Sequence, residues 1–275
     1  MRTQAEKGTA FRELHHRDRA FIIPNPWDAG TARLLEHLGY EALASTSAGY
    51  AFSVGKLDGE VSRDEMIKHV GELAASSDLP VSADLENGFA DDPEGAAETI
   101  RRAADVGCAG GSIEDVTSRG GEVRIYDIEF AAERVRAAVE AARGLAFTFT
   151  LTARAENYIA GNPDLADTIK RLQAFQEAGA DVLFAPGITS PDDIRAVISS
   201  VDRPVNVIMG LQGVTLTLDE LSALGVKRIS VGSALSRAAY GAFLRAAQEM
   251  KEHGTFNFAD DAVGYKDITA MLAKK

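Results

Sequence analysis

The sequence predicts an α/β fold, a (β/α)8 TIM-type barrel. Two observations predict it: eight short apolar runs recur along the 275 residues, and segments with helical spacing lie between them. Strands joined through helices pair in parallel, and eight such units are the number that closes a barrel. A doubly wound open sheet is the alternative, but the first strand lacks the glycine-rich turn typical of dinucleotide-binding sheets. The predicted strands are Ala20–Pro24, Ala42–Ser45, Pro80–Ala83, Gly111–Glu114, Phe147–Ala153, Val182–Ala185, Val205–Ile208 and Arg228–Val231.

The helical segments carry recognisable start and stop signals. Ser190 and Thr217 stand where N-caps are expected, and glycines follow several helices where a left-handed C-cap would fall. No linker or low-complexity stretch interrupts the alternation, which predicts a single domain over residues 1–275. The predicted helices are Thr31–Leu38, Arg63–Ala75, Pro93–Asp105, Ile128–Ala142, Asp164–Ala178, Pro191–Ser199 and Leu218–Leu224, and the capping glycines are Gly39, Gly107, Gly179 and Gly225.

The C-terminal part is longer than an eighth barrel helix requires. Ala234–His253 has the pattern of a long amphipathic helix, and a further helical pattern follows at Ala262–Ala273. We interpret residues 234–275 as a C-terminal helical extension. An extension of this kind often packs on another subunit, although it can also cover its own barrel.

Composition limits the classes of partner. The formal net charge of −12 argues against nucleic acid and anionic membrane surfaces, since both need clustered Lys and Arg. Cys108 is the single cysteine, which excludes an intrachain disulfide and fits a reducing compartment. Without a signal-peptide pattern or a long apolar run, the protein is expected to be cytoplasmic. His15 and His16 are expected to be solvated residues on a first helix.

Acidic residues recur where predicted strands end. Asp84 and Glu86 follow the third strand, Glu114 and Asp115 follow the fourth, and Asp58 stands in a glycine-flanked turn. A buried carboxylate is costly unless its charge is compensated, and hard oxygen ligands suit Mg²⁺ or Mn²⁺. The pattern therefore predicts a divalent metal site. Helix caps and turns are the alternative explanation, since Asp and Glu are common in both.

The remaining strand ends add a cation and hydrogen-bond donors. Arg154 ends the fifth strand and is suited to bidentate capture of a substrate carboxylate, although it can also pair with Glu156 or Glu114. The turn Ser45–Tyr50 is small and hydroxyl-rich, so its backbone N–H groups can face a carboxylate or enolate oxygen. Asn206 adds an amide. This set is suited to polarising a 2-oxo acid and stabilising an enolate.

Several motifs together resemble the isocitrate lyase and phosphoenolpyruvate mutase superfamily. They are Ile23-Pro24-Asn25-Pro26-Trp27-Asp28-Ala29, Lys56-Leu57-Asp58-Gly59, Ser82-Ala83-Asp84-Leu85-Glu86-Asn87-Gly88-Phe89, Ser112-Ile113-Glu114-Asp115 and Thr152-Ala153-Arg154. The resemblance covers nearly the whole chain. It implies a barrel whose eighth helix swaps onto a partner subunit, usually in a dimer of dimers, and a homo-oligomer is therefore expected.

The resemblance also implies roles for individual residues. Asp84 would ligate Mg²⁺ directly, with Mn²⁺ as a substitute, while Asp58, Glu86 and Glu114 would hold its waters. Arg154 falls on the family's carboxylate-binding arginine, and with Asp58 and Glu114 it completes the expected catalytic set. The residues expected to bind the substrate are Thr46, Ser47, Ala48, Arg154 and Asn206.

Departures from the family motifs restrict the reaction. Lyases of this family carry a Lys-Lys/Arg-Cys-Gly-His motif after the fourth strand, whereas Val116–Tyr126 contains no cysteine or histidine, and Pro186 stands where lyases have Glu and mutases have His. Cys108 precedes the fourth strand, at the other end of the barrel, so we expect it to be buried and not to replace the missing acid. Gly120-Gly121, Arg119 and Arg124 suggest that Val116–Tyr126 is a lid, although a plain solvated loop is the alternative.

Among the reactions of this family, decarboxylation of a β-oxo acid such as oxaloacetate depends least on the absent cysteine motif and on the Glu or His replaced by Pro186. The sequence therefore favours an Mg²⁺-dependent carbon–carbon lyase that acts on a small 2-oxo dicarboxylic acid through an enolate. Phosphorus–carbon chemistry on phosphonopyruvate is the first alternative, and a barrel that binds 2-oxo acids with little turnover is the second.

Overall fold

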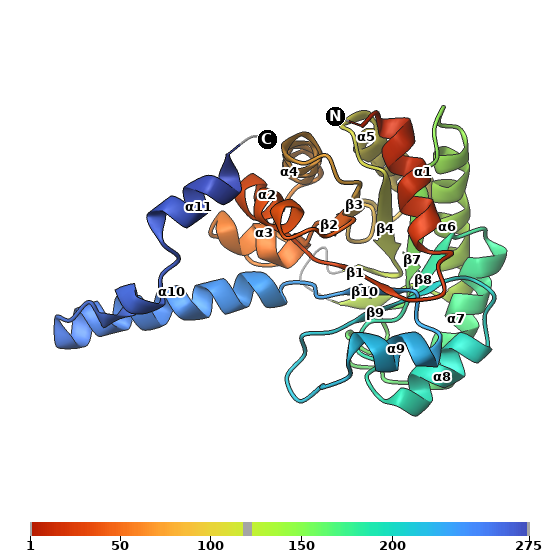
Figure 1. The fold of residues 1–275 in the computed structure, drawn as a ribbon. Helices are drawn as coiled ribbons and strands as arrows, with labels where there is room; N and C mark the ends of the chain where they lie inside the picture. Colours follow the sequence, from red (N-terminus) through yellow and green to blue (C-terminus); the bar gives the residue numbers. More distant parts are fainter. Residues whose placement is uncertain (1, 118–122, 274–275) are drawn as a thin grey trace.

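Eight parallel strands form a nearly closed barrel surrounded by helices (Figure 1). The structure is a computed structural model that describes residues 2–117 and 123–273. The predicted fold class is confirmed, and each predicted barrel strand corresponds to an observed one. In barrel order the strands are β1 (Phe21–Ile23), β10 (Arg228–Ser230), β9 (Val205–Ile208), β8 (Val182–Phe184), β7 (Thr150–Arg154), β4 (Gly110–Glu114), β3 (Val81–Asp84) and β2 (Leu43–Ala44).

Backbone pairing fixes which side chains meet inside the barrel. β4 and β7 pair along five residues, so Glu114 stands beside Arg154, and β3 is aligned so that Asp84 stands beside Ser112. The ring closes between β1 and β2, where the Ala44 N–H donates to the Pro24 carbonyl at 3.0 Å. Because the strands are parallel, all their carboxyl ends lie at one end of the barrel.

The helices begin and end close to the predicted residues. Ser190 and Thr217 cap their helices with side-chain hydrogen bonds, and the four predicted capping glycines have φ between +86° and +105°. The helices flanking the barrel are α1 (Gln4–Leu14), α2 (Ala29–His37), α4 (Arg63–Ser76), α5 (Pro93–Asp105), α6 (Ile128–Arg143), α7 (Leu165–Glu177), α8 (Pro191–Ser199) and α9 (Leu218–Leu224). A short helix, α3 (Ser47–Ser53), lies where only a turn was predicted.

A two-stranded antiparallel sheet follows β4 and was not predicted. It pairs β5 (Val116–Thr117) with β6 (Arg124–Ile125). The sheet brings both ends of the predicted lid together. Arg119, Gly120 and Gly121 lie outside the described residues.

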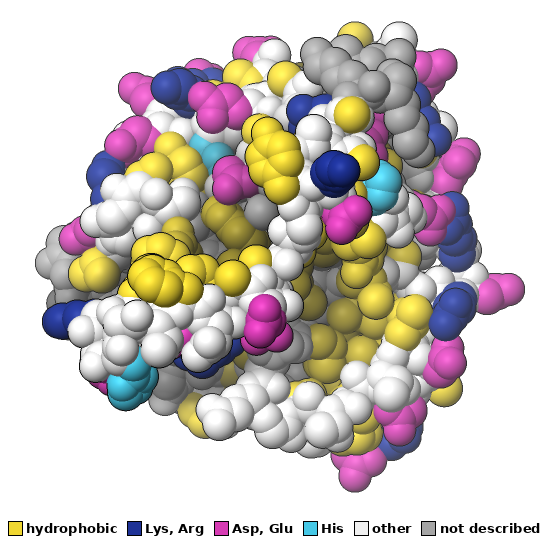
Figure 2. All heavy atoms as spheres, turned by 60° about the vertical axis from the view of Figure 1, so that its left-hand side comes forward, with side chains coloured by type: hydrophobic (Ala, Val, Ile, Leu, Met, Phe, Trp, Pro, Cys, Tyr) yellow, Lys and Arg dark blue, Asp and Glu magenta, His cyan; other side chains and the backbone are white. Residues whose placement is uncertain are grey.

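The C-terminal extension leaves the barrel as a long helix and then turns back. α10 (Ala234–His253) projects away from the barrel and buries only Ser236 among its residues, while α11 (Tyr265–Leu272) returns to contact α2 (Figure 1). A 3-10 helix, η1 (Asn257–Asp261), lies between them. On the side where α10 projects, Figure 2 shows hydrophobic side chains reaching the surface. No helix within residues 2–117 or 123–273 is both long and apolar enough to cross a membrane.

The expectation that His15 is solvated is wrong. His15 follows α1, and its ring packs edge-on between Phe11 and Phe21, with Nδ1 2.9 Å from the Phe11 carbonyl oxygen. α1 lies across the amino ends of the strands and carries this ring inward, which the polar sequence around it does not indicate. His16 is exposed, as expected.

Candidate active site

The predicted site residues converge at the carboxyl ends of three neighbouring strands. Asp84 is the last residue of β3, Glu114 the last of β4 and Arg154 the last of β7. β4 is hydrogen-bonded to both of the other strands, so these three side chains project from adjacent positions. The register of the sheet thus assembles residues that are up to 70 positions apart in sequence.

One guanidinium group stands among three carboxylates. Arg154 Nη1 lies 2.7 Å from Asp84 Oδ1, while Nη2 lies 3.2 Å from Glu114 Oε2 and 2.7 Å from Glu156 Oε1. The guanidinium carbon also lies 5.4 Å from the centre of the Phe184 ring. Arg154 does pair with Glu114 and Glu156, as the alternative interpretation foresaw, but it binds Asp84 as well.

The start of α3 is attached directly to Asp84. The Ser47 N–H donates to Asp84 Oδ2 at 3.0 Å, and the Asp84 N–H donates to Ser45 Oγ at 2.7 Å. Thr46 caps α3, with its hydroxyl accepting from the Gly49 N–H at 3.2 Å. The predicted substrate-binding segment Thr46, Ser47 and Ala48 therefore lies beside the first acid of the site.

The loop after β3 has an unusual backbone. Glu86 and Phe89 are the two non-glycine residues with positive φ in the described chain, at +49° and +55°. Such conformations cost free energy in residues with a Cβ and recur at functional sites. The Glu114 N–H donates to the Glu86 carbonyl at 2.9 Å, which ties this loop to the end of β4.

Negative charge exceeds positive charge in this cluster. Partial desolvation, followed by repulsion from Asp84, raises the pKa of Asp58, an exposed residue whose carboxylate accepts a hydrogen bond from Ser47. Burial raises the pKa of Glu114 well above its usual range, against the attraction of Arg154 and with the repulsion of Glu156, Asp84 and Glu86. A further cation at this place would relieve both the repulsion and the burial cost.

The donor set fits a hard divalent cation. All the candidate ligands are carboxylates, the donors that Mg²⁺ and Mn²⁺ prefer. Across the described stretches no three His, Cys, Asp or Glu side chains already stand close enough together to hold a metal ion, and Arg154 lies in the space between Asp84, Glu114 and Glu156. The carboxylates and their excess negative charge fit a divalent cation. In this structure the Arg154 guanidinium occupies the space between them and balances part of that charge.

Asp115 pairs with a different arginine from the other acids. Its carboxylate is buried, accepts the Glu156 N–H at 2.8 Å and pairs with Arg171 at 3.0 Å. Burial raises the pKa of Asp115, and the Arg171 guanidinium partly opposes the shift. We interpret Asp115 as a structural acid that holds the segment after β7.

Two residues were not predicted as site residues, although Glu156 was named as a possible partner of Arg154. Glu156 is almost fully buried and makes two contacts with Arg154. Arg228 begins β10 and lines a cavity together with Asp84, Arg154 and Asn206, of which the last three were predicted. The sequence feature that could have identified Arg228 is a charged residue at the start of a predicted strand.

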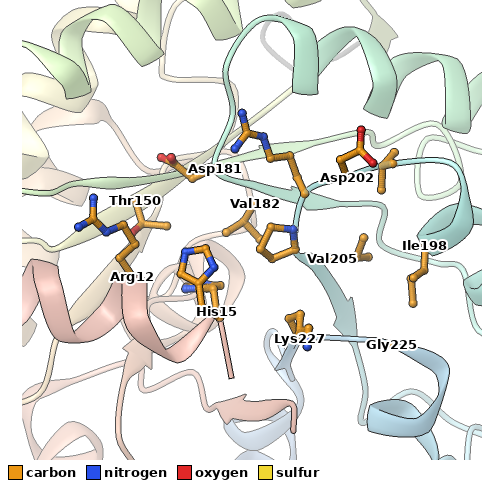
Figure 3. A pocket seen from close by; sticks show the side chains of 14 residues that line it. Arg12, His15, Thr150, Asp181, Val182, Ile198, Asp202, Val205, Gly225 and Lys227 are labelled. Atoms are coloured by element: carbon orange, nitrogen blue, oxygen red, sulfur yellow. The ribbon is translucent and has the colours of Figure 1, made fainter. Parts of the chain in front are cut away.

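The structure contains a small cavity at this site and a larger one elsewhere. The active-site cavity has a volume of about 80 Å³ and is lined by Asp84, Arg154, Asn206 and Arg228, among others. A cavity of about 450 Å³ lies at the amino ends of β7, β8 and β9, where Arg12, His15 and Lys227 surround it (Figure 3). It contains none of the predicted site residues.

Comparisons with known proteins identify the family of the chain. Residues 11–251 match the phosphoenolpyruvate phosphomutase family, and the chain belongs to this family. It is 28% identical to the 2-methylisocitrate lyase of Bacillus subtilis strain 168, over 92% of this chain and 84% of that protein. Among solved structures, a Burkholderia cenocepacia J2315 protein provisionally described as a lyase/mutase is 61% identical, with a TM-score of 0.95 over 98% of this chain and 97% of the other. A phosphonopyruvate hydrolase solved with oxalate and Mg²⁺ is 23% identical, with a TM-score of 0.85 over 98% and 95% of the two chains, and shows the fold alone.

Proposed function

We propose that the protein is an Mg²⁺-dependent carbon–carbon lyase that acts on a small 2-oxo dicarboxylic acid such as oxaloacetate. The observation that carries the proposal is the convergence of Arg154 with Asp84, Glu114 and Glu156 at the carboxyl ends of the strands. Active sites of barrel enzymes lie at this end. Membership of a family that includes lyases supports the same class of reaction.

The residues that would hold Mg²⁺ are Asp84, directly, and Asp58, Glu86 and Glu114, through water. Mg²⁺ bound there would supply a Lewis acid that polarises a 2-oxo group and stabilises the negative charge of an enolate. Arg154 would exchange its contacts with the acids for a bidentate contact with a substrate carboxylate. Thr46, Ser47 and Ala48 would orient the same end of the substrate, since Ser47 already donates to Asp84.

The position of the single cysteine supports a reaction that starts without a cysteine acid. Cys108 is fully buried in the turn before β4, and burial raises the pKa of its thiol to about 12. It lies at the end of the barrel opposite Asp84. Loss of CO₂ from a β-oxo acid breaks the carbon–carbon bond before any proton is needed, so this reaction suits the residues present.

Phosphorus–carbon chemistry on phosphonopyruvate is the second candidate. The observation that favours it is the match to the phosphoenolpyruvate phosphomutase family. Against it, Pro186 stands where the mutases carry histidine.

A metal-dependent substrate screen tests the proposal. The purified protein is incubated with oxaloacetate, other 2-oxo and β-hydroxy acids, and phosphonopyruvate, each with MgCl₂ or with EDTA, and the products are followed by NMR. We expect Mg²⁺-dependent cleavage of a 2-oxo dicarboxylate above the spontaneous rate. Phosphate or phosphoenolpyruvate release alone would instead establish the second candidate, and binding without turnover would establish a 2-oxo acid binding barrel.

We also propose that the chain forms a homo-oligomer through α10. This helix exposes Phe243 (66%), Leu244 (56%) and Met250 (41%), and only Ser236 of its twenty residues is buried. A second copy of the chain is the partner that would cover this face. Light scattering during size-exclusion chromatography should give a mass of at least two chains, and Phe243→Glu with Leu244→Glu should reduce it to one.

A further inference from the structure

Arg228 is a buried cation that faces the active-site cavity without a matching anion. It begins β10, is 5% exposed, and lines the cavity that also contains Asp84 and Arg154. Its Nε donates to Asn206 Oδ1 at 2.9 Å, and Nη1 lies 3.5 Å from His15 Nε2. Within the described part of the chain no carboxylate forms an ion pair with Arg228, and no hydrogen bond engages its Nη2.

The neighbours of Arg228 do not balance its charge. Asn206 is neutral, and burial lowers the pKa of His15 to about 3, so this imidazole is neutral as well. Burial and repulsion from Arg154 lower the pKa of Arg228 to about 9, which leaves the guanidinium protonated at neutral pH. An uncompensated buried charge is destabilising, and a neutral side chain would fill the same space at lower cost.

The two arginines of this cavity therefore differ in their readiness to bind an anion. Arg154 is held by three carboxylates at the carboxyl end, whereas the Arg228 guanidinium retains free N–H groups nearer the amino end. The Asn206 amide also donates to Ser230 Oγ at 3.0 Å, so its carbonyl is fixed toward Arg228. This arrangement holds the fork of Arg228 in place before any ligand enters.

We propose that Arg228, positioned by Asn206, forms a second carboxylate-binding pocket at the inner end of the active-site cavity and selects small dicarboxylates over monocarboxylates. The proposal rests on the proposed function and names its substrate class more closely. The volume of about 80 Å³ has room for a few water-sized groups, which suits a planar carboxylate. The second carboxylate would supply the negative charge that Arg228 lacks.

A carboxylate bound by Arg228 would affect KM and kcat differently. In decarboxylation of oxaloacetate the C3–C4 bond breaks, its electron pair remains on C3 as the enolate, the C4 carboxylate leaves as CO₂, and a proton from water then gives pyruvate. The departing carboxylate loses its charge, so its contact with Arg228 is stronger in the ground state than in the transition state. Loss of Arg228 should therefore raise KM and should not lower kcat.

Ligand binding to an Arg228→Met variant tests the pocket without turnover. Malonate, acetate and phosphonoacetate are titrated calorimetrically into the full chain in the presence of MgCl₂. We expect the wild type to bind malonate at least tenfold more tightly than acetate, and Arg228→Met to reduce this preference to less than twofold. Arg195→Met is the matched control, because it removes a cation that pairs with Asp192 on the surface, and it should keep the preference.

Thermal unfolding separates a binding role from a structural one. Since Arg228→Met removes an uncompensated buried charge, its Tm should equal or exceed that of the wild type without ligand. A lower Tm together with an unchanged preference for malonate would overturn the pocket and make Arg228 a structural residue. If Arg228→Met does not fold, Arg228→Gln decides the same comparison. Tighter binding of phosphonoacetate than of malonate would contradict a carboxylate pocket.

Kinetics distinguish failure of the pocket from failure of the proposed function. With a cleaved dicarboxylate, Arg228→Met should raise KM at least tenfold and leave kcat within a few-fold of wild type. Malonate selectivity that depends on Arg228, without cleavage of any 2-oxo dicarboxylate, would support the pocket and overturn the proposed lyase. Cleavage with an unchanged KM in Arg228→Met would support the lyase and overturn the pocket.

Discussion

The two ends of the barrel differ in how their charges are balanced. At the amino end, around the cavity of about 450 Å³, Asp181 pairs with Arg143 at 2.5 Å, and the Lys227 ammonium donates to the Arg17 carbonyl at 2.8 Å. At the carboxyl end, around a cavity of about 80 Å³, one guanidinium faces three carboxylates. The comparison teaches that an imbalance of buried charge, rather than the size of a cavity, marks the place where chemistry is expected.

Removing the first acid of the carboxyl end should have the largest effect. Asp84→Ala should reduce kcat/KM by at least about a hundredfold. Mutating a residue that only hydrogen-bonds to a metal ligand typically costs about 10- to 100-fold, and loss of a direct ligand should cost more. Arg154 keeps Glu114 and Glu156 as partners, so the Tm should change by only a few degrees. The measurement is turnover with and without MgCl₂, and full wild-type activity in excess chelator would contradict the metal assignment.

Removing the cation of the same cluster should have an effect of similar size on turnover. Arg154→Ala should cost about 2–5 kcal/mol in transition-state binding, because a buried carboxylate loses a charge-assisted bidentate partner. Arg154→Lys should recover little of this, since an ammonium cannot reproduce the planar fork. Near-normal kcat/KM for Arg154→Ala on every cleaved substrate would show that the assignment is wrong.

Asp115 offers a control at the same end of the barrel. Arg171 keeps Asp167 as a partner at 2.6 Å, so Asp115→Ala should lower the free energy of unfolding by about 1–3 kcal/mol, through loss of one buried ion pair and of the acceptor for the Glu156 N–H. Its kcat, measured below the unfolding transition, should stay within tenfold of wild type. Denaturant unfolding gives the first quantity. A hundredfold loss of kcat with normal stability would place Asp115 in the catalytic cluster.

The amino end provides the smallest expected effect. Cys108→Ser should leave kcat/KM within about twofold of wild type, because the thiol is buried before β4 and its pKa is raised to about 12. Its stability should fall modestly, since a hydroxyl replaces a buried apolar group. A loss of turnover with the fold preserved would overturn the conclusion that the reaction proceeds without a cysteine acid.

The sequence was sufficient for the barrel because its strands are apolar and punctuated by Gly, Pro and capping residues. The strand predicted to begin at Phe147 begins at Thr150, because Phe147 and Phe149 pack as core residues before the sheet pairing starts. α3 was missed because Ser47–Ser53 is composed largely of small residues without helical periodicity. The two-residue strands β5 and β6 are too short to show an alternation.

The acids and Arg154 were singled out from the sequence, and the Arg154–Glu114 and Arg154–Glu156 pairs were considered as an alternative, but the contact of Arg154 with Asp84 was not foreseen. Strand-end positions can be read from the sequence, which is why Asp84, Glu114 and Arg154 were singled out. The three-way contact of Arg154, the separation of Asp115 and the exposure of Arg228 to the cavity depend on the register between strands that are distant in sequence. The burial of His15 likewise depends on where α1 crosses the barrel.

Direct titration of Mn²⁺, followed by electron paramagnetic resonance of the free ion, tests the central claim that the unbalanced acids of the carboxyl end hold a divalent metal. The account predicts one site per chain in the wild type, competition by Mg²⁺, loss of the site in Asp84→Asn and its retention in Asp115→Asn. Equal binding by the wild type and Asp84→Asn, or loss of binding in Asp115→Asn alone, would contradict it.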